Sequence, residues 1–369
     1  MKLKIAILGT RGIPNRYGGF EQLAEHLSKG LVKRGHGVTV YSSHRHPYQL
    51  SDLEGVEIIH RYDPENEMGT AGQFIYDLNC IRHARKNKFD VLLFLGYTSS
   101  SLWGGLYPQK PVVISNMDGM EWKRAKYAKP VRTFLEFAES LAIKYSDFYI
   151  ADSPKIQQYL HTKYDINAVY IPYGAEIFPG DRSTLLSSFG ITHHNYYLLI
   201  ARMEPENNVE TILDGFHQSN SEKVFIVIGS TKNKFGKYLQ KKFMNDGRIQ
   251  FIGPLFDPAK THLLRYHSLL YFHGHSAGGT NPSLLEAMAS HALIAAHRNE
   301  FNSSVLMQDA YYFSSAEEVK YLIENICRTP SADLMTARNF VKIQQKFNWP
   351  MIIDQYEAFI LKCFEQSGK

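Results

Sequence analysis

A loop of small residues that runs into a helix is the first candidate site, with the sequence HGHSAGGTNPSLLEAMAS at residues 273–290. Asn281 is of a type that caps helix N-termini, and Pro282 suits the first helical position. Backbone amides of the loop and of the first helical turn can then bind phosphate oxygens. Glu286 lies about one turn into the helix, where a carboxylate can accept hydrogen bonds from ribose hydroxyls. These residues alone are also compatible with a capped core helix that carries one exposed glutamate.

A second candidate is Arg202 in the stretch LLIARMEPENN, residues 198–208. It directly follows an apolar run that predicts a buried strand, so it should lie at the carboxyl end of that strand. An arginine there can hold a diphosphate through forked, charge-assisted hydrogen bonds. The alternative is a surface arginine at the end of the sheet.

A glycine-bearing loop near the N-terminus, GTRGIPNRYGGFEQ at residues 9–22, also lies between a predicted strand and a predicted helix. Glycines such as Gly18 and Gly19 let backbone amides approach a ligand closely, and the following helix N-terminus favours an anion. The spacing is not GxGxxG, and no acidic residue ends the next strand, VTVYSS, so a nicotinamide cofactor is disfavoured. An ordinary strand-to-helix turn remains open.

The stretch SNMDGMEWKRAKYAKPVR, residues 115–132, combines an aspartate with basic and aromatic residues. Asp118 follows a predicted strand, so it is a candidate for orienting an acceptor hydroxyl or sharing its proton. The alternative is a turn aspartate before Gly119. Trp122 and the basic residues around it suit an anionic membrane surface or a lipid-diphosphate acceptor. A solvated helix face explains the same residues equally well.

His273 and His275 flank the first candidate loop, but no carboxylate or cysteine with ligand spacing accompanies them. We expect them to be wall residues or ordinary surface histidines, and we expect no metal. The three cysteines are odd in number and have no metal spacing, which favours free thiols in a reducing cytoplasm.

Alternating strands and helices must position these residues. Apolar runs predict strands at KIAILG, VTVYSS, VLLFLGY, PVVISNM and DFYIADS, and again at YYLLIAR, KVFIVIGS, IQFIGPL, SLLYFHG and LIAAH. Continuous apolar strands separated by helices indicate parallel sheets covered on both faces. We therefore predict two Rossmann-like domains, residues 1–172 and 173–348, with a final helix at 349–369 packing back onto the first. Ligands of such sheets bind beyond the carboxyl ends of the strands, so we expect the site in a central cleft.

Composition and charge agree with a globular protein of two domains. The 369 residues are 44% hydrophobic and 21% charged, and no apolar run is long enough to span a bilayer. Residues 1–172 carry 22 Lys and Arg against 17 Asp and Glu, whereas the remainder carries 19 of each. This asymmetry suggests an anionic partner for the first half. DNA is disfavoured, because the excess is modest and no DNA-binding motif is present.

Three of these stretches together resemble a known family. GTRGIPNRYGGFE, DGMEWKR at 118–124 and GGTNPSLLEAM are similar to retaining GT-B glycosyltransferases of family 4, in particular a bacterial subgroup of capsule and exopolysaccharide rhamnosyltransferases. The resemblance covers nearly the whole chain. It implies an α/β GT-B fold, a sugar nucleotide held mainly by the second domain, an acceptor held mainly by the first, and no metal or cofactor.

The sequence departs from the wider family at two positions. The family carries two glutamates eight residues apart; Glu286 matches the second, whereas Gly278 stands in place of the first. The family also carries a lysine five residues after the arginine, where this chain has Asn207. Since the subgroup that it resembles shares both changes, we interpret the site as working but altered for its donor.

The resulting hypothesis is a retaining hexosyltransferase, cytoplasmic or peripheral on the inner face of the membrane. It transfers L-rhamnose from dTDP-L-rhamnose to a saccharide or lipid-linked saccharide acceptor. Alternatives are transfer from a UDP- or GDP-hexose, a nucleotide-sugar 2-epimerase of the same fold, and a non-catalytic sugar-nucleotide-binding protein. The catalytic candidates are Asp118 and Arg202. The donor-binding candidates are Gly18, Gly19, Arg202, Asn207, Gly278, Gly279, Thr280, Asn281 and Glu286. The candidates on the acceptor or membrane side are Arg16, Glu121, Trp122, Lys123 and Arg124.

Overall fold

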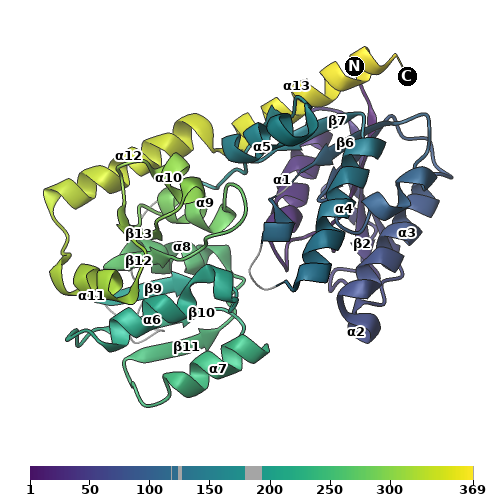
Figure 1. Ribbon diagram of the computed structural model, residues 1–369. Helices are drawn as coiled ribbons and strands as arrows, with labels where there is room; N and C mark the ends of the chain where they lie inside the picture. The colour runs from purple at the N-terminus through teal and green to yellow at the C-terminus, as the bar shows by residue number, and fades with distance from the viewer. Residues whose placement is uncertain (118, 124–126, 179–192, 369) are drawn as a thin grey trace. The chain divides into compact units, whose positions relative to one another are not determined.

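A computed structural model describes residues 1–117, 119–123, 127–178 and 193–368, with the side chain of Glu121 excepted. The chain divides into two compact units (Figure 1). The first unit contains Met1–Lys123, Tyr127–Tyr173 and Trp349–Lys369, and the second contains Gly174–Asn348. The last helix of the chain therefore belongs to the unit that the N-terminus begins.

The first unit is built on an eight-stranded sheet of order β3-β4-β2-β1-β5-β6-β7-β8. Every described pairing in it is parallel except that of β3 with β4. The strands are β1 Lys4–Leu8, β2 Gly37–Ser43, β3 Asp52–Leu53, β4 Val56–Arg61, β5 Val91–Leu95, β6 Val112–Asn116, β7 Phe148–Ala151 and β8 Val169–Tyr170. All five residues of β5 are buried, as expected for a strand that is covered on both faces.

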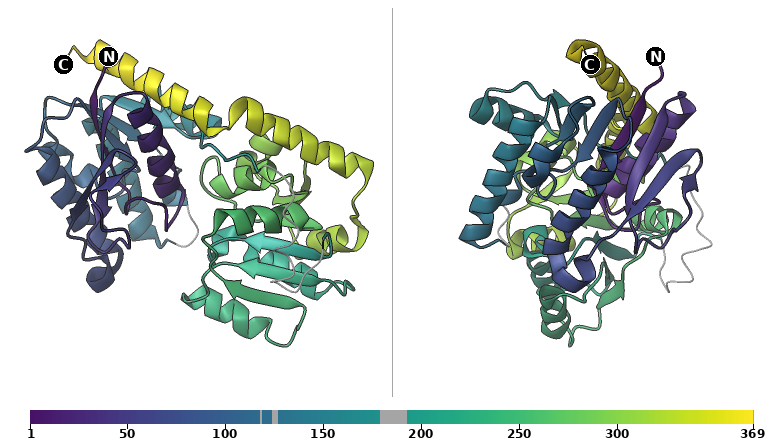
Figure 2. Two further views of the ribbon diagram at one scale, coloured as in Figure 1. Left: turned by 180° about the vertical axis from the view of Figure 1, so that it is seen from behind. Right: turned by 90° about the vertical axis from the view of Figure 1, so that its right-hand side faces the viewer.

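Helices cover this sheet on both faces. They are α1 Gly19–Lys33, α2 Glu65–Met68, α3 Gly72–Ala84, α4 Lys129–Tyr145, α5 Pro154–Tyr164 and α13 Trp349–Ser367. Buried side chains of α3 form one hydrophobic cluster with β1, β2 and β5. Helix α13 packs against α1 and β6, and its end lies near the N-terminus in all the views of Figures 1 and 2.

The second unit is built on a six-stranded, fully parallel sheet of order β11-β10-β9-β12-β13-β14. Its strands are β9 Tyr196–Ile200, β10 Val224–Ile228, β11 Ile249–Gly253, β12 Leu270–His273, β13 Ile294–His297 and β14 Tyr311–Phe313. Its helices are α6 Val209–His217, α7 Lys234–Lys242, α8 Pro258–His267, α9 Pro282–Ala289, α10 Glu300–Leu306, α11 Ala316–Asn325 and α12 Pro330–Lys346. The chain order reverses at β9, because β10 and β11 lie on one side of it and β12 to β14 on the other.

All ten predicted strands are present in these two sheets, and the prediction of an α/β fold with two parallel sheets is confirmed. Strand β4 was not predicted, because Glu57, His60 and Arg61 interrupt its apolar pattern and only two of its six residues are buried. The other omissions, β3, β8 and β14, have two or three residues each. Such short strands carry too few residues for a periodic signal.

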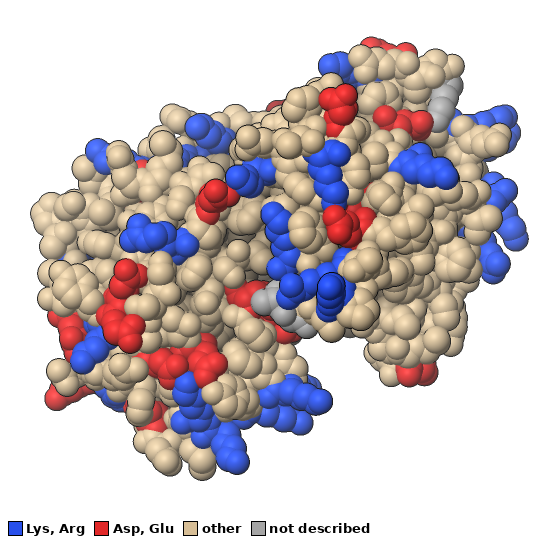
Figure 3. All heavy atoms as spheres, in the orientation of Figure 1, with Lys and Arg blue, Asp and Glu red and all other residues tan. Residues whose placement is uncertain are grey.

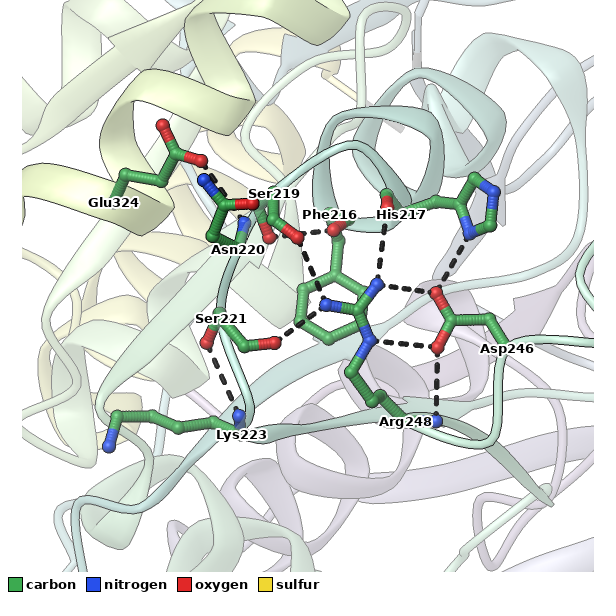
Figure 4. Close-up of polar contacts among 9 residues, drawn as sticks. All are labelled: Phe216, His217, Ser219, Asn220, Ser221, Lys223, Asp246, Arg248 and Glu324. Carbon is green, nitrogen blue, oxygen red and sulfur yellow. Dashed lines mark hydrogen bonds and ion pairs between the residues drawn. The ribbon is translucent and has the colours of Figure 1, made fainter.

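A closed polar cluster joins the end of α6 to the start of β11 (Figure 4). All three guanidinium nitrogens of Arg248 donate hydrogen bonds. Nη1 donates to the carbonyls of Ser219 at 3.0 Å and Ser221 at 2.6 Å, and Nη2 donates to that of His217 at 3.1 Å. Nε and Nη2 also hold the buried Asp246 carboxylate at 2.9 and 2.7 Å. The open carbonyl of His217, the last residue of α6, is therefore satisfied within the unit, together with two carbonyls of the segment that follows the helix.

Charged side chains are mixed over the face that Figure 3 shows, with blue and red spheres close to one another. A group of Lys and Arg side chains lies where Figure 1 places α7. Lys242 of this helix pairs with Glu210 and Asp214. Basic and acidic side chains are therefore paired locally on the second unit.

Candidate functional site

The carboxyl ends of β9 and β12 are the natural ligand position in the second unit. These two strands are neighbours at the point where the strand order reverses, and doubly wound sheets bind ligands at such a point. The two loops that follow them are bonded together. Asn208 donates from Nδ2 to the carbonyl of Gly274 at 2.8 Å, and the amide of Ser276 donates to the carbonyl of Glu206 at 3.0 Å.

Gly274 allows this close approach of the two loops. A Cβ atom at this position would lie 2.1 Å from the carbonyl oxygen of Asn207. Only glycine therefore fits without displacing the backbone of the neighbouring loop. The loops after β9 and β12 consequently form one continuous surface at the switch point.

Arg202 lies two residues beyond β9, and its side chain is exposed. Its backbone is fixed, because its carbonyl accepts hydrogen bonds from the amide of Glu204 and from Nδ2 of Asn207, both at 2.8 Å. Within the described part of the chain, its guanidinium makes no hydrogen bond or ion pair. Arg202 is therefore a cation with fixed backbone and open donors at the switch point.

Asn207 is buried, with 4% of its surface exposed. Its side-chain amide supports the turn that carries Arg202, through the 2.8 Å bond to the Arg202 carbonyl. This role differs from the diphosphate contact that the sequence suggested, and that contact stays a prediction.

The predicted cap of the helix after β12 is confirmed. Oδ1 of Asn281 accepts a hydrogen bond from the amide of Ser283 at 2.9 Å, with proline at the first position of α9. The proline has no N–H, and the next amides donate to Asn281, so the first turn has no open donor. In the described residues, the amides of Gly278 and Gly279 donate to nothing. The loop therefore offers the open amides, whereas the prediction had also included the first helical turn. Thr280, beside them, is buried.

Gly278 has a backbone φ of +110°, a conformation that side-chain-bearing residues rarely adopt. A Cβ atom there would meet no other atom within 4 Å. The backbone conformation, and not crowding, therefore disfavours a glutamate at this position. A loop that carries a glutamate at this position would therefore be expected to have a different backbone conformation.

Glu286 lies on α9 with 23% of its side chain exposed, and it forms an ion pair with Arg265 of α8. The distance from Arg265 Nη2 to Glu286 Oε2 is 2.7 Å. Arg265 is 2% exposed and is the largest fully buried side chain described. Arg265 was not among the predicted site residues, although a lone arginine in the apolar stretch HLLRYHSLL is a usable signal.

His273 is fully buried at the end of β12 and stacks on His275, with ring centroids 4.4 Å apart. Burial lowers the pKa of His273 well below its ordinary value, and nearby His275, Arg265 and His297 lower it further. It is a neutral wall residue at pH 7, so the surface alternative for it is wrong. Among the described residues, no three His, Cys, Asp or Glu side chains are grouped as metal ligands.

Arg11 of the glycine loop of the first unit is held by two helices of that unit. Arg11 forms a forked pair with Glu65, at 2.7 Å from Nε and 2.6 Å from Nη2. Its amide donates to the buried Glu21 at 2.9 Å. Gly18 precedes α1 without a side-chain cap, and Gly19 begins that helix. Their predicted donor contact stays a prediction.

The residues predicted for the acceptor or membrane side are only partly described. Asp118 and Arg124 lie outside the described residues, as does the side chain of Glu121. Trp122 donates from Nε1 to the hydroxyl of Tyr159 at 3.2 Å, and exposed Lys123 lies over its ring at 5.2 Å. Arg16 is exposed on the glycine loop. The structure therefore places Trp122 against α5 and brings Lys123 to it, whereas their partner stays a prediction.

Comparison with known proteins is informative at the level of the fold. Residues 2–176 match a family described as a domain of unknown function, DUF1972. No curated protein matches the sequence. The structure of sucrose-phosphate synthase from Thermosynechococcus elongatus is similar with a TM-score of 0.81 at 16% identity, over 99% of this chain and 100% of that one.

Two further solved structures extend the likeness. HepE of Anabaena in complex with UDP-glucose has a TM-score of 0.74 at 14% identity, over 98% of this chain and 100% of that one. WaaG, a glycosyltransferase involved in lipopolysaccharide biosynthesis, has a TM-score of 0.73 at 13% identity, over 97% and 99%. The chain has the GT-B fold. Within the described part of this GT-B protein, no helix is both long and apolar enough to cross a bilayer.

Proposed function

We propose that this GT-B protein is a retaining glycosyltransferase that takes its sugar from a nucleotide diphosphate sugar. The second unit, Gly174–Asn348, binds the donor, and the first unit binds the acceptor. The observation that carries the proposal is the exposed guanidinium of Arg202, which has no partner in the described residues and lies at the switch point of the second sheet.

The chemistry requires positive charge where the leaving diphosphate develops negative charge. Arg202 provides a fixed-backbone cation with forked donors, and the open amides of Gly278 and Gly279 provide neutral donors on the adjoining loop. Such preorganised donors stabilise the transition state without reorganisation. Asn207 contributes by holding the backbone of Arg202, through its bond to the carbonyl of that residue.

We propose dTDP-L-rhamnose as the donor, because the sequence resembles rhamnosyltransferases. The conformation of Gly278, at φ +110°, supports a donor pocket that differs from the wider family's. A UDP-hexose is the second candidate, because the similar HepE structure holds UDP-glucose. A lipid-linked diphosphate saccharide is the proposed acceptor, since residues 1–172 carry the excess of Lys and Arg. Asp118 is the residue that we propose to orient its hydroxyl.

A thermal-shift screen tests the proposal with dTDP-L-rhamnose, UDP-glucose and GDP-mannose, and with NAD as the unrelated control. A ligand that binds only the folded state stabilises it by about 2.7 kcal/mol at a hundred times its Kd. We expect a rise in Tm with dTDP-L-rhamnose that Arg202→Ala weakens. No shift with any sugar nucleotide would contradict the proposal.

A transfer assay with the donor that binds then identifies the reaction. We expect release of the nucleoside diphosphate to depend on a saccharide acceptor. Conversion of the donor without acceptor would identify a 2-epimerase instead. Binding without turnover on any acceptor would identify a non-catalytic binding protein.

A further inference from the structure

We propose that Arg265 is a positioning residue that holds the Glu286 carboxylate for a hydroxyl of the nucleotide's ribose. The inference rests on the proposed function, because it concerns recognition of the same sugar nucleotide. Arg265 reaches Glu286 from α8, through the 2.7 Å contact between Nη2 and Oε2.

The surroundings of Arg265 fix its guanidinium beneath the first turns of α9. Nη2 also donates to Oγ of Ser283 at 3.1 Å, and that oxygen lies 2.9 Å from the hydroxyl of Tyr271 on β12. The guanidinium carbon lies 5.7 Å from the Tyr271 ring centroid. Ser283 of α9 contacts Arg265 directly, and Tyr271 of β12 contacts that serine and lies beside the guanidinium.

Arg265 remains a cation despite its burial. Burial lowers the pKa of its guanidinium, the Glu286 carboxylate raises it, and the net direction is upward. The neighbouring histidines do not share this charge, since burial lowers the pKa of His262 to about 4 and that of His273 well below its ordinary value, with Arg265 lowering both further. Arg265 thus carries the positive charge of this cluster at pH 7.

Stability alone is a poor explanation for this arginine. Nε and Nη1 are buried without a hydrogen-bond partner in the described residues. A buried ion pair is often no more stable than apolar residues of the same volume, and unpaired buried donors make it less so. The costly arrangement does, however, give the partner carboxylate one orientation.

Orientation matters for Glu286 because its side chain reaches solvent, with 23% exposed. A glutamate on a helix surface otherwise samples several rotamers and loses that freedom when it binds a ligand. A carboxylate that is already ordered avoids this cost and binds more tightly. Arg265 therefore makes Glu286 a preorganised acceptor one turn into the helix that the donor loop precedes.

Discrimination between a nucleotide and its 3′-deoxy analogue tests the inference. Calorimetry gives the Kd of dTDP or UDP, whichever binds better, and of the analogue, for wild type, Arg265→Met and Glu286→Gln. We expect wild type to prefer the 3′-hydroxyl by about tenfold, as for a hydrogen bond to a charged group. In both variants the preference should fall to about twofold or less.

The matched control is Arg248→Met, the same substitution at an arginine of the closed cluster in the same unit, and it should keep the wild-type preference. If Arg265→Met does not fold, Arg265→Gln replaces it, because glutamine retains a donor in the buried site. The preference of Arg265→Gln for the 3′-hydroxyl should also fall. Full preference in the Arg265 variants would overturn the inference and leave the proposed function standing. A wild type that ignores the 3′-hydroxyl would overturn the inference as well. A wild type that binds no nucleotide would remove the proposed function itself.

Discussion

Two polar regions of the second unit use arginine in opposite ways. Around Arg248, every guanidinium nitrogen bonds to a carbonyl of the segment 217–221 or to Asp246. At the carboxyl ends of β9 and β12, the Arg202 guanidinium is exposed and bonds to nothing described, while only its backbone is held. The first region is complete in the folded chain, whereas the second has donors that only a ligand would satisfy.

The difference separates groups that hold the fold from groups that are available for chemistry. Closed clusters stabilise, because buried polar groups without partners are costly. Open donors on a fixed backbone suit a developing charge, because they need not break existing bonds to meet it. The glycine loop of the first unit resembles the closed kind, since Arg11 is engaged by Glu65. We therefore expect substitution of Arg202 to change mainly turnover and substitution of Arg248 to change mainly stability.

The largest expected effect is on turnover in Arg202→Ala. Loss of a charged partner of the leaving diphosphate should cost about 2–4 kcal/mol of transition-state stabilisation, or about 30- to 1,000-fold in kcat/KM. The free energy of unfolding should change little, because the side chain is exposed. Steady-state kinetics and urea unfolding measure the two quantities. Unchanged kcat/KM in a folded variant would remove Arg202 from the site.

Arg248→Ala should show the reverse behaviour. The Asp246 carboxylate, 6% exposed, would lose its main partner, and three carbonyls would lose their donors. We expect a loss of about 2–3 kcal/mol in the free energy of unfolding, with kcat/KM of the folded protein within about twofold. If activity falls as steeply as in Arg202→Ala, the distinction between closed and open clusters fails.

A smaller effect on the free energy of unfolding is expected at Gly278, where backbone strain and charge can be separated. Gly278→Ala adds no charge, and its Cβ would meet no atom within 4 Å. It should therefore lower the free energy of unfolding by about 1–2 kcal/mol, through the strain of a φ of +110° alone. Gly278→Glu adds a carboxylate near the open amides and should abolish rhamnosyl transfer, with little change in the affinity for free dTDP. Transfer assays and calorimetry on both variants give the comparison. Hexosyl transfer gained by Gly278→Glu from an inactive wild type would instead indicate a decayed family pattern.

The smallest effect is the pH dependence of the closed cluster. Hydrogen bonds from Arg248 are the main reason that the pKa of Asp246 is lowered, with burial opposing them. A lowered pKa in the folded state gives stability that is present above the unfolded value of about 4 and is lost as pH falls through the folded value. Asp246→Asn should therefore cost about 1–2 kcal/mol at pH 7 and progressively less below pH 4. Urea unfolding at pH 7 and pH 3 checks the sign, and an equal cost at both would refute it.

Local pattern in the sequence determined much of this protein. Apolar runs determined ten strands, of which all but the edge strand β11 lie inside their sheets, because a strand covered on both faces needs apolar residues along its length. Asn281 and Pro282 determined the start of α9, because capping depends on the residues at the helix end alone. The position of Arg202 after β9 followed from the same local pattern.

The tertiary structure alone decided what each of these side chains meets. Strand order placed β9 beside β12, and so brought the Arg202 loop to the loop of Gly278. Packing buried His273 and paired Glu286 with Arg265, which stands 21 positions earlier in the chain. The physical reason is that partners distant in sequence are selected by sheet order and helix packing, and not by local propensity. An exposed guanidinium and a fully engaged one are therefore the same letter in the sequence, and only the fold distinguishes Arg202 from Arg248.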